Sequence, residues 1–169
     1  MSDPIPNTLT IQLTKGYSTV IDTVDADLAQ RSWYASIKTN AAYAYTQIRV
    51  NGKKKCIGMH RLILERMIGR PLERFEFTDH INNNPLDNRR CNLRLATPAQ
   101  NMCNQGKSTK NKSGFKGVCY EEHGRKRWVA YISISGKRKK IGRFDTPEAA
   151  HEAYKKAAAE LHGEFARFE

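Results

Sequence analysis

The sequence lacks the features of secreted, zinc-ribbon and membrane-spanning proteins. Its four cysteines, Cys56, Cys91, Cys103 and Cys119, include no Cys-x-x-Cys pair, so neither a zinc ribbon nor a disulfide framework is expected, and the thiols should be reduced. No run of 18 apolar residues is present to span a membrane. The first residues, Met1-Ser2-Asp3-Pro4, lack the basic and apolar regions of a secretory signal. A cytoplasmic location is therefore expected.

Acidic residues are also scarce, since 17 Asp and Glu stand against 29 Lys and Arg, for a net charge of +12. The excess is +3 for residues 1–55, +2 for 56–105 and +7 for 106–169, and residues 107–143 hold 12 basic but two acidic residues. This balance favours a polyanionic partner. The alternative is a disordered basic tail. The aromatic and β-branched residues Phe115, Trp128, Tyr131 and Ile132 lie among the basic ones and argue against disorder.

One short stretch brings together the groups of a metal-dependent phosphodiesterase. Asp79-His80, Asn92 and Asn101 fall within 23 residues. The pattern predicts a strand over 77–81, a polar loop over 82–92, a strand over 93–95 and a helix that starts at Thr97-Pro98. Carboxylate and amide oxygens suit Mg²⁺ or Mn²⁺, and a histidine titrates near neutrality, as a general base should. Because successive residues of a strand face opposite sides, the strand must end or bend for Asp79 and His80 to share a site.

This order resembles the HNH nuclease motif, in particular that of phage and intron-encoded homing endonucleases. The matching segments are Asp79-His80-Ile81, Leu86-Asp87-Asn88-Arg89-Arg90, Asn92-Leu93-Arg94 and Asn101. The resemblance implies that Asp79 and Asn101 hold one divalent metal ion, Mg²⁺ or Mn²⁺, that His80 is the general base, and that Asn92 orients the histidine or the loop. Asn101 stands where many members have the final histidine. His60 matches another recurring position, as a scaffold residue or as a direct participant.

The residues before the motif read as short strands. Leu9–Leu13 and Tyr43–Val50 alternate in polarity, and Asn51-Gly52 predicts a hairpin turn into Lys53–Met59. An apolar helix over Leu62–Ile68 should stop at Gly69. The resemblance joins this β-rich part, 1–60, to one nuclease domain over 1–106, with its ββα-metal core at about 75–106.

Residues 107–114 are polar, basic and without periodicity, which predicts a linker. It is either a passive tether or a segment that lies along phosphates. Three strand-like runs follow, Phe115–Tyr120, Arg127–Ser135 and Lys139–Phe144, with turns at His123-Gly124 and Ser135-Gly136. A helix should begin with Thr146 as cap and Pro147 in first position and end at Gly163, and its small alanines should let it lie close against a sheet. The residues that repeat at helical spacing are Ala150, Ala153, Tyr154, Ala157 and Leu161.

This βββα module resembles the AP2 DNA-binding domain over 113–168, through segments such as Gly117-Val118, Trp128–Ile132 and Ile141–Thr146. Alternation in the second strand puts Trp128, Ala130, Ile132 and Ile134 on one face, toward the helix, and the opposite face is the one that the resemblance docks on DNA. Cys119 and Glu121 depart from family arginines, and Tyr131 and Ser133 from a glutamate and an arginine, so sequence preference does not transfer. A basic sheet that binds phosphates nonspecifically is the alternative. The expected DNA contacts of the whole chain are Arg89, Arg90, Lys116, Gly117, Arg127, Tyr131, Ser133, Arg138, Lys140 and Arg143.

The sequence therefore predicts an α+β protein with an HNH ββα-metal domain at 1–106, a basic linker at 107–114 and an AP2-like domain at 115–169. The expected function is site-directed, metal-dependent hydrolysis of double-stranded DNA, without a small-molecule substrate, in the cytoplasm of a bacterial host. A monomer is slightly favoured. The alternatives are a non-catalytic DNA-binding regulator with a degenerate nuclease fold, and a structure-specific repair or recombination nuclease. The sequence does not identify the target site, and it does not distinguish nicking of one strand from cleavage of both strands.

Overall fold

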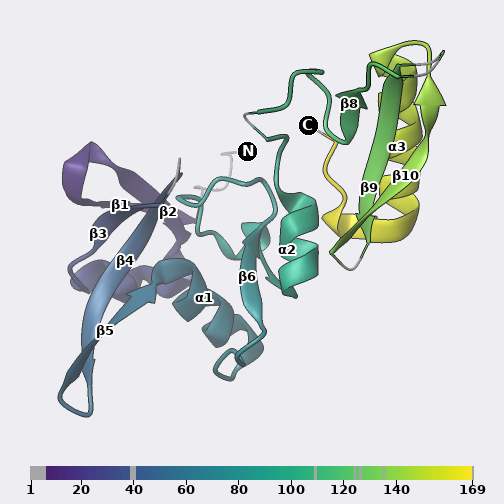
Figure 1. The fold of residues 1–169 in the computed structure, drawn as a ribbon. Helices are drawn as coiled ribbons and strands as arrows, with labels where there is room; N and C mark the ends of the chain where they lie inside the picture. Colours follow the sequence, from purple (N-terminus) through teal and green to yellow (C-terminus); the bar gives the residue numbers. More distant parts are fainter. Residues whose placement is uncertain are drawn as a thin grey trace, which may run out of the picture. The chain divides into compact units, whose positions relative to one another are not determined.

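The computed structural model describes residues 7–38, 41–108, 110–123, 125, 127–134 and 136–168. Of the sequence predictions, Met1–Pro4, Thr109 in the linker, and the turn residues Gly124 and Ser135 lie outside these ranges. The chain forms an α+β fold of small antiparallel sheets and divides into two compact units at the junction of Ala96 and Thr97 (Figure 1). The predicted domain bounds stay a prediction, and each unit is described separately below.

The first unit begins with two antiparallel sheets. Strands β1 (Thr8–Gln12) and β2 (Ser18–Asp22) form a pair, and β3 (Tyr34–Lys38), β4 (Ala41–Val50) and β5 (Lys53–Gly58) form a sheet in the order β3-β4-β5. Short 3₁₀ turns, η1 (Thr14–Gly16) and η2 (Thr23–Gln30), connect them. Strands β2 and β3 were not predicted as strands.

The predicted turn at Asn51-Gly52 joins β4 and β5. Both residues have positive φ, 50° and 74°, as a tight hairpin turn requires. Helix α1 (Met59–Ile68) follows directly and ends at Gly69, whose φ of 71° makes it a left-handed cap. The helix starts three residues before its predicted start at Leu62.

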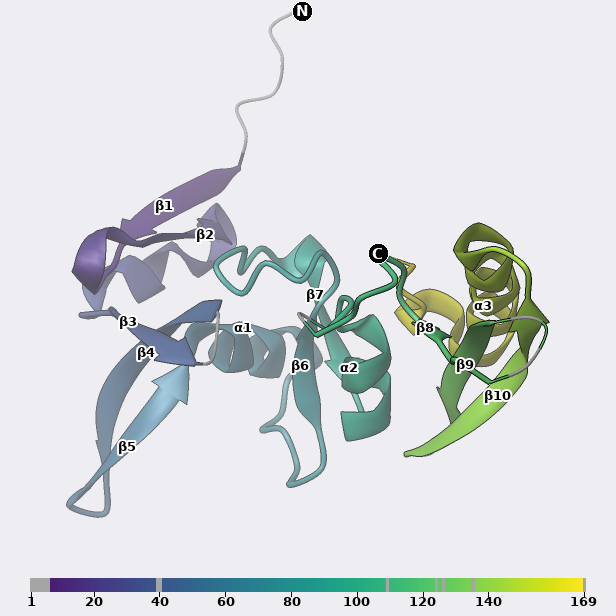
Figure 2. The same ribbon diagram turned by 45° about the horizontal axis from the view of Figure 1, so that its top comes forward.

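The motif region forms the predicted order of strand, loop, strand and helix. Strand β6 (Phe77–His80) pairs with β7 (Leu93–Ala96), and the loop between them ends in the short turn η3 (Arg90–Asn92) (Figure 2). Helix α2 (Pro98–Asn104) begins the second unit. Thr97 and Gln100 form a capping box at its start, which explains why the helix begins there.

The core of the first unit packs α1 against β1–β4 and β7. Its central side chains are fully buried, namely Ile21, Leu28, Met59, Ile63 and Ala44. The loop between β6 and β7 is joined to β2 by backbone hydrogen bonds, from Val20 N to Leu86 O at 2.9 Å and from Asn88 N to Val20 O at 2.8 Å. Strand β2 thereby supports the loop that carries the motif residues.

The second unit contains the predicted βββα module. Strands β8 (Val118–Tyr120), β9 (Trp128–Ile134) and β10 (Lys137–Phe144) form one antiparallel sheet, and α3 (Pro147–His162) packs on it, followed by η4 (Gly163–Phe165) (Figure 1). Thr146 caps α3 and Gly163 follows its last residue, as predicted. Ala150 and Tyr154 are buried, but Leu161 is 53% exposed and the buried residue of that turn is Ala158. Leu161, in the last turn, therefore does not extend the buried face of the helix.

The predicted linker holds a structured turn. Asn111 Oδ1 accepts hydrogen bonds from the backbone N–H groups of Ser113 and Gly114, and its amide donates to Phe115 O at 2.8 Å. An asparagine turn of this kind orders a polar segment without regular secondary structure. It places Phe115 against the core of the module.

All four cysteines are free thiols. Among the described residues, no helix is both long and apolar enough to cross a membrane.

Candidate functional site

His80 is the last residue of β6, and a chain of hydrogen bonds holds its ring. Its Nε2 lies 3.2 Å from Oδ1 of Asn88, whose Nδ2 donates to the Thr19 hydroxyl at 2.7 Å. The hydroxyl in turn donates to the carbonyl of Leu86 at 2.7 Å. Both Asn88 and Thr19 are fully buried.

The direction of this chain determines the tautomer of His80. A carbonyl oxygen only accepts, so the Thr19 hydroxyl donates to Leu86 and its oxygen accepts from the Asn88 amide nitrogen. The amide oxygen of Asn88 therefore faces His80, and Nε2 must carry the proton that it donates. In the neutral ring, Nδ1 then holds the lone pair. Nδ1 is the atom that would accept a proton from water.

Burial keeps His80 in this neutral form. Desolvation lowers its pKa below 6.5, against the opposing effects of the Asn88 hydrogen bond and of the Asp79 and Asp87 carboxylates. A general base must be unprotonated at the working pH, so this shift suits the role that the sequence predicts.

A second imidazole, His60 in the first turn of α1, lies against His80. The two ring centres are 5.4 Å apart, and His60 also contacts Tyr43 at 5.8 Å and Tyr45 at 6.1 Å. Burial, and then the proximity of His80, lower the pKa of His60 to about 3. Its buried Nδ1 has no hydrogen-bond partner within the described part of the chain. The packing role proposed from the sequence agrees with these ring contacts.

Gly58 makes room for the His60 ring. A Cβ at this position would lie 2.4 Å from Cε1 of His60, closer than carbon atoms approach. The φ of Gly58 is −78°, so the backbone does not require glycine there. The requirement is steric.

Asp79 lies on the other face of β6 from His80, because the two are successive residues of a paired strand. It is 2% exposed, and its Oδ2 accepts a hydrogen bond from Nε of Arg94 at 2.8 Å, across the strand pair. No bend separates the two residues within β6, which ends at His80, so the convergence of Asp79 and His80 on one site stays a prediction.

Asn92 holds the loop. Its Oδ1 accepts from the backbone N–H of Asn82 at 3.0 Å, and its Nδ2 donates to Asn82 Oδ1 and to the carbonyl of Asp87. Of the two roles that the resemblance gave it, these bonds match the orientation of the loop. Asn88, which had no predicted role, is bonded to the histidine.

Asn101, the other predicted metal ligand, lies in α2 and thus in the second unit. Its amide oxygen and the carboxylate of Asp79 are hard oxygen donors of the kind that Mg²⁺ and Mn²⁺ take. No group of three or more His, Cys, Asp and Glu side chains within the described ranges is arranged to hold a metal ion. The donor types fit such an ion, and the two-ligand site stays a prediction.

The two predicted DNA contacts of the loop are engaged in ion pairs. Arg89 forms two 2.7 Å hydrogen bonds with Asp87, and Arg90 bonds to the buried carboxylate of Asp25 at 2.8 and 3.1 Å. Arg66 also bonds to Asp25, at 3.0 Å. Arg90 is therefore a structural residue that connects the loop to η2, and a DNA contact would have to share its guanidinium.

Four of the predicted DNA contacts of the second unit lie on one side of its sheet. Tyr131 and Ser133 on β9 pair with Lys140 and Arg138 on β10, on the side of the sheet away from α3. The guanidinium of Arg138 stacks at 3.8 Å over the Tyr131 ring. Glu121 lies at the edge of this face and bonds to Arg143 and to the hydroxyl of Tyr131.

The remaining predicted contacts have local partners. Lys116 donates from Nζ to the carbonyl of Cys103 at 2.6 Å, near the end of α2, and burial lowers its pKa to about 8. Gly117 has a φ of 77°, and a Cβ there would lie 2.1 Å from the ring of Tyr154, so packing explains this glycine. Arg127 donates to the hydroxyl of Tyr120 at 2.8 Å.

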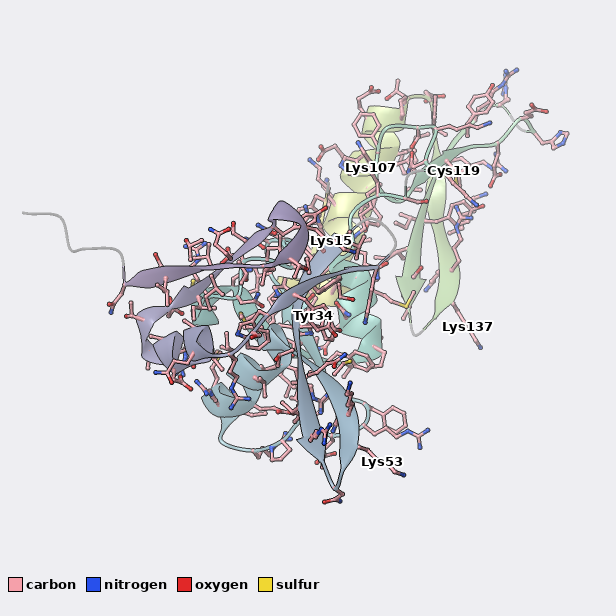
Figure 3. The ribbon with its side chains drawn as sticks, turned by 90° about the vertical axis from the view of Figure 1, so that its left-hand side faces the viewer. Lys15, Tyr34, Lys53, Lys107, Cys119 and Lys137 are labelled. Carbon is pink, nitrogen blue, oxygen red and sulfur yellow. The ribbon has the colours of Figure 1, made fainter. Side chains whose placement is uncertain are left out.

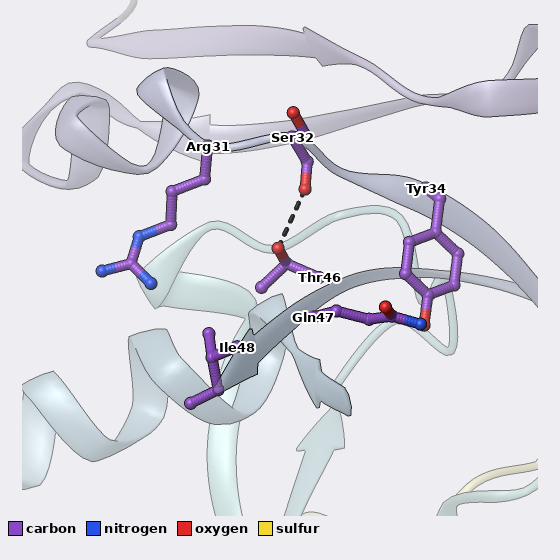
Figure 4. A pocket seen from close by; sticks show the side chains of 6 residues that line it. All are labelled: Arg31, Ser32, Tyr34, Thr46, Gln47 and Ile48. Carbon is purple, nitrogen blue, oxygen red and sulfur yellow. Dashed lines mark hydrogen bonds between the residues drawn. The ribbon is translucent and has the colours of Figure 1, made fainter. Parts of the chain in front are cut away.

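A cavity of about 660 Å³ lies elsewhere in the first unit, beside β3 and β4 (Figure 4). It is lined by Arg31, Ser32, Tyr34, Thr46, Gln47 and Ile48. The hydroxyl of Thr46 bonds to the carbonyl of Ser32 at 2.9 Å across it. Its lining has no carboxylate and no imidazole, so the cavity offers no acid-base chemistry comparable to that of His80.

Sequence reasoning missed three contributors to the His80 environment, namely Thr19, Tyr43 and Asn88. Asn88 was visible as part of the matched Asp-Asn-Arg-Arg segment, and that was the one available signal. Thr19 precedes Asn88 by 69 residues and is brought to it by folding.

Comparisons with known proteins match the region of the chain that holds these residues. The family described as HNH endonuclease matches residues 58–103, which include Gly58, His60, Asp79, His80 and Asn101. Protein 3.8 of Escherichia phage T7 is 36% identical over 98 residues, covering 58% of this chain and 79% of that protein. The uncharacterized HNH endonuclease L560 of Acanthamoeba polyphaga mimivirus is 35% identical over 108 residues, 64% of this chain and 54% of that protein. No solved structure matches.

The matched region contains both strands of the motif, the loop between them and most of α2, and the similarity to the phage protein spans most of that relative. The chain belongs to the HNH endonuclease family.

Proposed function

We propose that this chain is a site-directed DNA endonuclease of the homing type, which hydrolyses phosphodiester bonds of double-stranded DNA in its HNH region. The observation that carries the proposal is the directional hydrogen-bond chain from Leu86 through Thr19 and Asn88 to His80. A satisfied buried network of this kind holds a histidine ring in one orientation and one tautomer, as a general base requires.

In the proposed reaction, Nδ1 of His80 takes a proton from a water molecule as its oxygen attacks the phosphorus. The P–O3′ bond breaks, which leaves a 5′-phosphate and a 3′-hydroxyl after the 3′ oxygen gains a proton from solvent. The carboxylates of Asp79 and Asp87, which already favour the charged form of His80, would stabilise the imidazolium that forms. Asp79 and Asn101 would hold one Mg²⁺ or Mn²⁺ ion, which supplies charge neutralisation at the phosphate.

We propose further that the C-terminal module targets the enzyme in the manner of an AP2 domain. Support comes from the βββα order and from the cross-strand cluster of Tyr131, Ser133, Arg138 and Lys140 on the face away from α3. A two-strand ribbon with polar and cationic side chains on one face fits a major groove. Chemistry and targeting would then lie in different parts of the chain.

One observation favours a second candidate, a DNA-binding regulator with a degenerate nuclease fold. Arg94 already neutralises the Asp79 carboxylate, which a metal ion would otherwise do. A true nuclease must therefore hold its metal ion beside this arginine.

A plasmid-nicking assay separates the two candidates. Supercoiled DNA should be converted to nicked or linear product by the full chain in Mg²⁺ or Mn²⁺ and not in EDTA, and the ends should be 5′-phosphates. His80→Ala should lose at least 10²-fold in rate while DNA binding persists. Binding without cleavage in either metal would support the regulator. Cleavage of branched DNA in preference to every linear site would instead support a repair or recombination nuclease.

A further inference from the structure

The first unit contains its own concentration of positive charge. Between Asp27 and Glu65 the sequence has seven basic residues and no acidic one, and the basic ones are Arg31, Lys38, Arg49, Lys53, Lys54, Lys55 and Arg61. This segment forms β3, β4, β5 and the start of α1. The excess of +7 in 37 residues equals that of the whole C-terminal third.

The register of the sheet sorts these side chains into two faces. Tyr45 is opposite Tyr34 on β3 and Gly58 on β5, and Arg49 is opposite Lys54. Side chains on alternate residues and cross-strand partners share a face. One face, which we call the basic aromatic face, therefore carries Tyr34, Lys38, Tyr43, Tyr45, Arg49 and Lys54, together with Ser36, Gln47 and Cys56.

The opposite face packs into the protein at its inner end. There the pair Ala35 and Ala44 is buried in the core. Lys53 and Lys55 belong to this second face at the tip of the hairpin, where Lys53 projects from the end of the ribbon (Figure 3). The two faces thus carry lysines at nearly the same distance from the body of the unit.

The basic aromatic face leads to the candidate base. Tyr43 lies 6.4 Å from the ring of His80, and both Tyr43 and Tyr45 contact His60, which lies against His80. Lys38 stacks over Tyr45 at 4.9 Å and donates to its hydroxyl. From the candidate base outward, the face therefore presents aromatic rings and then cations.

The cations at the outer end of this face are Arg49 and Lys54. Arg49 and Lys54 form no ion pair within the part of the chain that the structure describes, and both are exposed. Lysines near a sheet edge also prevent edge-to-edge association, which is their plainest explanation. That explanation requires charged side chains at the edge of the sheet, but it does not require that they lie on the basic aromatic face.

We propose that the basic aromatic face binds the phosphate backbone of double-stranded DNA beside the bond that is cleaved, and so gives the nuclease unit its own DNA platform. The inference rests on the proposed nuclease function and adds a surface to it. Arg49 is six residues from Tyr43, or ~20 Å along the strand. At ~3.4 Å of rise per nucleotide, the outer cations reach phosphates about six nucleotides from the scissile one.

The test compares two pairs of substitutions in the full chain. Arg49→Gln with Lys54→Gln removes two charges from the basic aromatic face, and Lys53→Gln with Lys55→Gln removes two from the opposite face at the same hairpin tip. All four side chains are exposed, so both variants should unfold at the parent temperature. Affinity for a duplex that contains the cleaved site is measured in EDTA at several salt concentrations, and single-turnover cleavage is measured in Mg²⁺.

The first variant should bind at least 10-fold more weakly near 0.1 M salt, with the slope of log affinity against log salt reduced by roughly 1.8. Its cleavage rate at saturating protein should stay near that of the parent. The second variant should change affinity less than threefold. Equal losses in the two variants, or no loss in either, would overturn the assignment of the face.

Phosphate ethylation adds a positional test. Ethylation of phosphates about four to eight nucleotides from the cleaved bond should weaken binding by the parent and by the opposite-face variant, but not by the variant of Arg49 and Lys54. If the parent binds this DNA without cutting it, the nuclease proposal is contradicted, but the difference in DNA affinity between the two variants still tests the basic aromatic face. A parent that does not bind DNA overturns both.

Discussion

Asn88 and His80 form a buried hydrogen bond, with Oδ1 of Asn88 3.2 Å from Nε2 of His80, and the other end of the amide is fixed by Thr19 at 2.7 Å. Because the direction of each donor is determined, the bond specifies that Nε2 of the neutral His80 ring carries the proton and Nδ1 the lone pair. Asn88 is thus a positioning residue in the proposed mechanism, and Thr19 determines which way Asn88 points.

Asn88→Ala should lower the cleavage rate by roughly 10–100-fold with little change in KM, because a ring that is free to rotate presents the wrong nitrogen to water. Thr19→Val should have a smaller effect in the same direction, since the Asn88 amide nitrogen then loses the hydroxyl acceptor that orients it. Single-turnover cleavage rates of the parent and of both variants from pH 5 to 9 measure these losses. Both variants should also change the acid limb of the pH profile, whereas equal losses at every pH would indicate a structural role alone.

Asp79→Ala should lose activity in Mg²⁺, and excess metal should not restore it, because the proposed site loses its only charged ligand. Asn101→Asp keeps an oxygen donor and should retain part of the activity with altered metal preference. The measurement is cleavage rate against Mg²⁺ and Mn²⁺ concentration, together with Mn²⁺ affinity of the uncleaved complex. Normal cleavage by Asp79→Ala after EDTA treatment would exclude the metal mechanism.

Local signals in the sequence predicted much of the fold. The Asn51-Gly52 turn, the caps at Thr97 and Thr146, and the glycine end of α1 each depend on residues close together in the chain, and all were found where expected. Strand β2 was missed because five residues of mixed polarity give a weak alternation, and its identity depends on pairing with β1.

The site was harder to predict because its geometry depends on distant contacts. The motif identified His80 and Asn92, but the hydrogen-bond partner of His80 is Asn88. Asn88 is oriented by Thr19, which lies on a different strand pair. Likewise, Arg90 was expected to contact DNA. Its carboxylate partner, Asp25, precedes it by 65 residues. A basic residue can be assigned to DNA or to an ion pair only when its neighbours in space are known.

Gly58→Ala should lower the cleavage rate by roughly 10²-fold, because its Cβ would push the His60 ring against His80. His60→Ala removes the ring that is struck, so the double variant should be no slower than His60→Ala alone. A double-mutant cycle of single-turnover rates measures this coupling. Additive effects of the two substitutions would show that Gly58 acts through another contact.

His60 should make the protein less stable in mild acid. Its pKa is about 3 when folded, through burial and the proximity of His80, and near 6.5 when unfolded. The unfolded chain therefore binds the extra proton between these values, so this contribution to stability is complete above pH 6.5, falls as the pH falls, and is fully lost by about pH 3. At pH 4.5 the loss is about 2–3 kcal/mol, and the lowered pKa of His80 acts in the same direction.

Replacement by phenylalanine tests this contribution. His60→Phe keeps an aromatic ring against Tyr43 and removes the titrating group, so its free energy of unfolding should decrease less between pH 7 and pH 4.5 than that of the parent. Urea unfolding at pH 7 and pH 4.5 gives the change in the free energy of unfolding for the parent and for the variant. An unchanged difference would mean that His60 is accessible to protons in the folded state.

Arg138 and Lys140 should contribute to DNA binding in different ways. Arg138 is held by its stacking on Tyr131 and by a 2.7 Å contact to Sγ of Cys119, which keeps its planar fork in one orientation. Lys140 is exposed and its flexible chain carries a point charge. We therefore expect Arg138→Ala to relax preference at one base pair by roughly 1–3 kcal/mol. Lys140→Ala should weaken binding to all duplexes about equally and reduce the slope of log affinity against log salt by about 0.9.

Lys137→Ala, at the start of the same strand, is the matched control for charge. Binding to the selected target and to single-base variants at several salt concentrations measures all three, and a uniform loss from every substitution would show that this sheet binds phosphates without reading sequence.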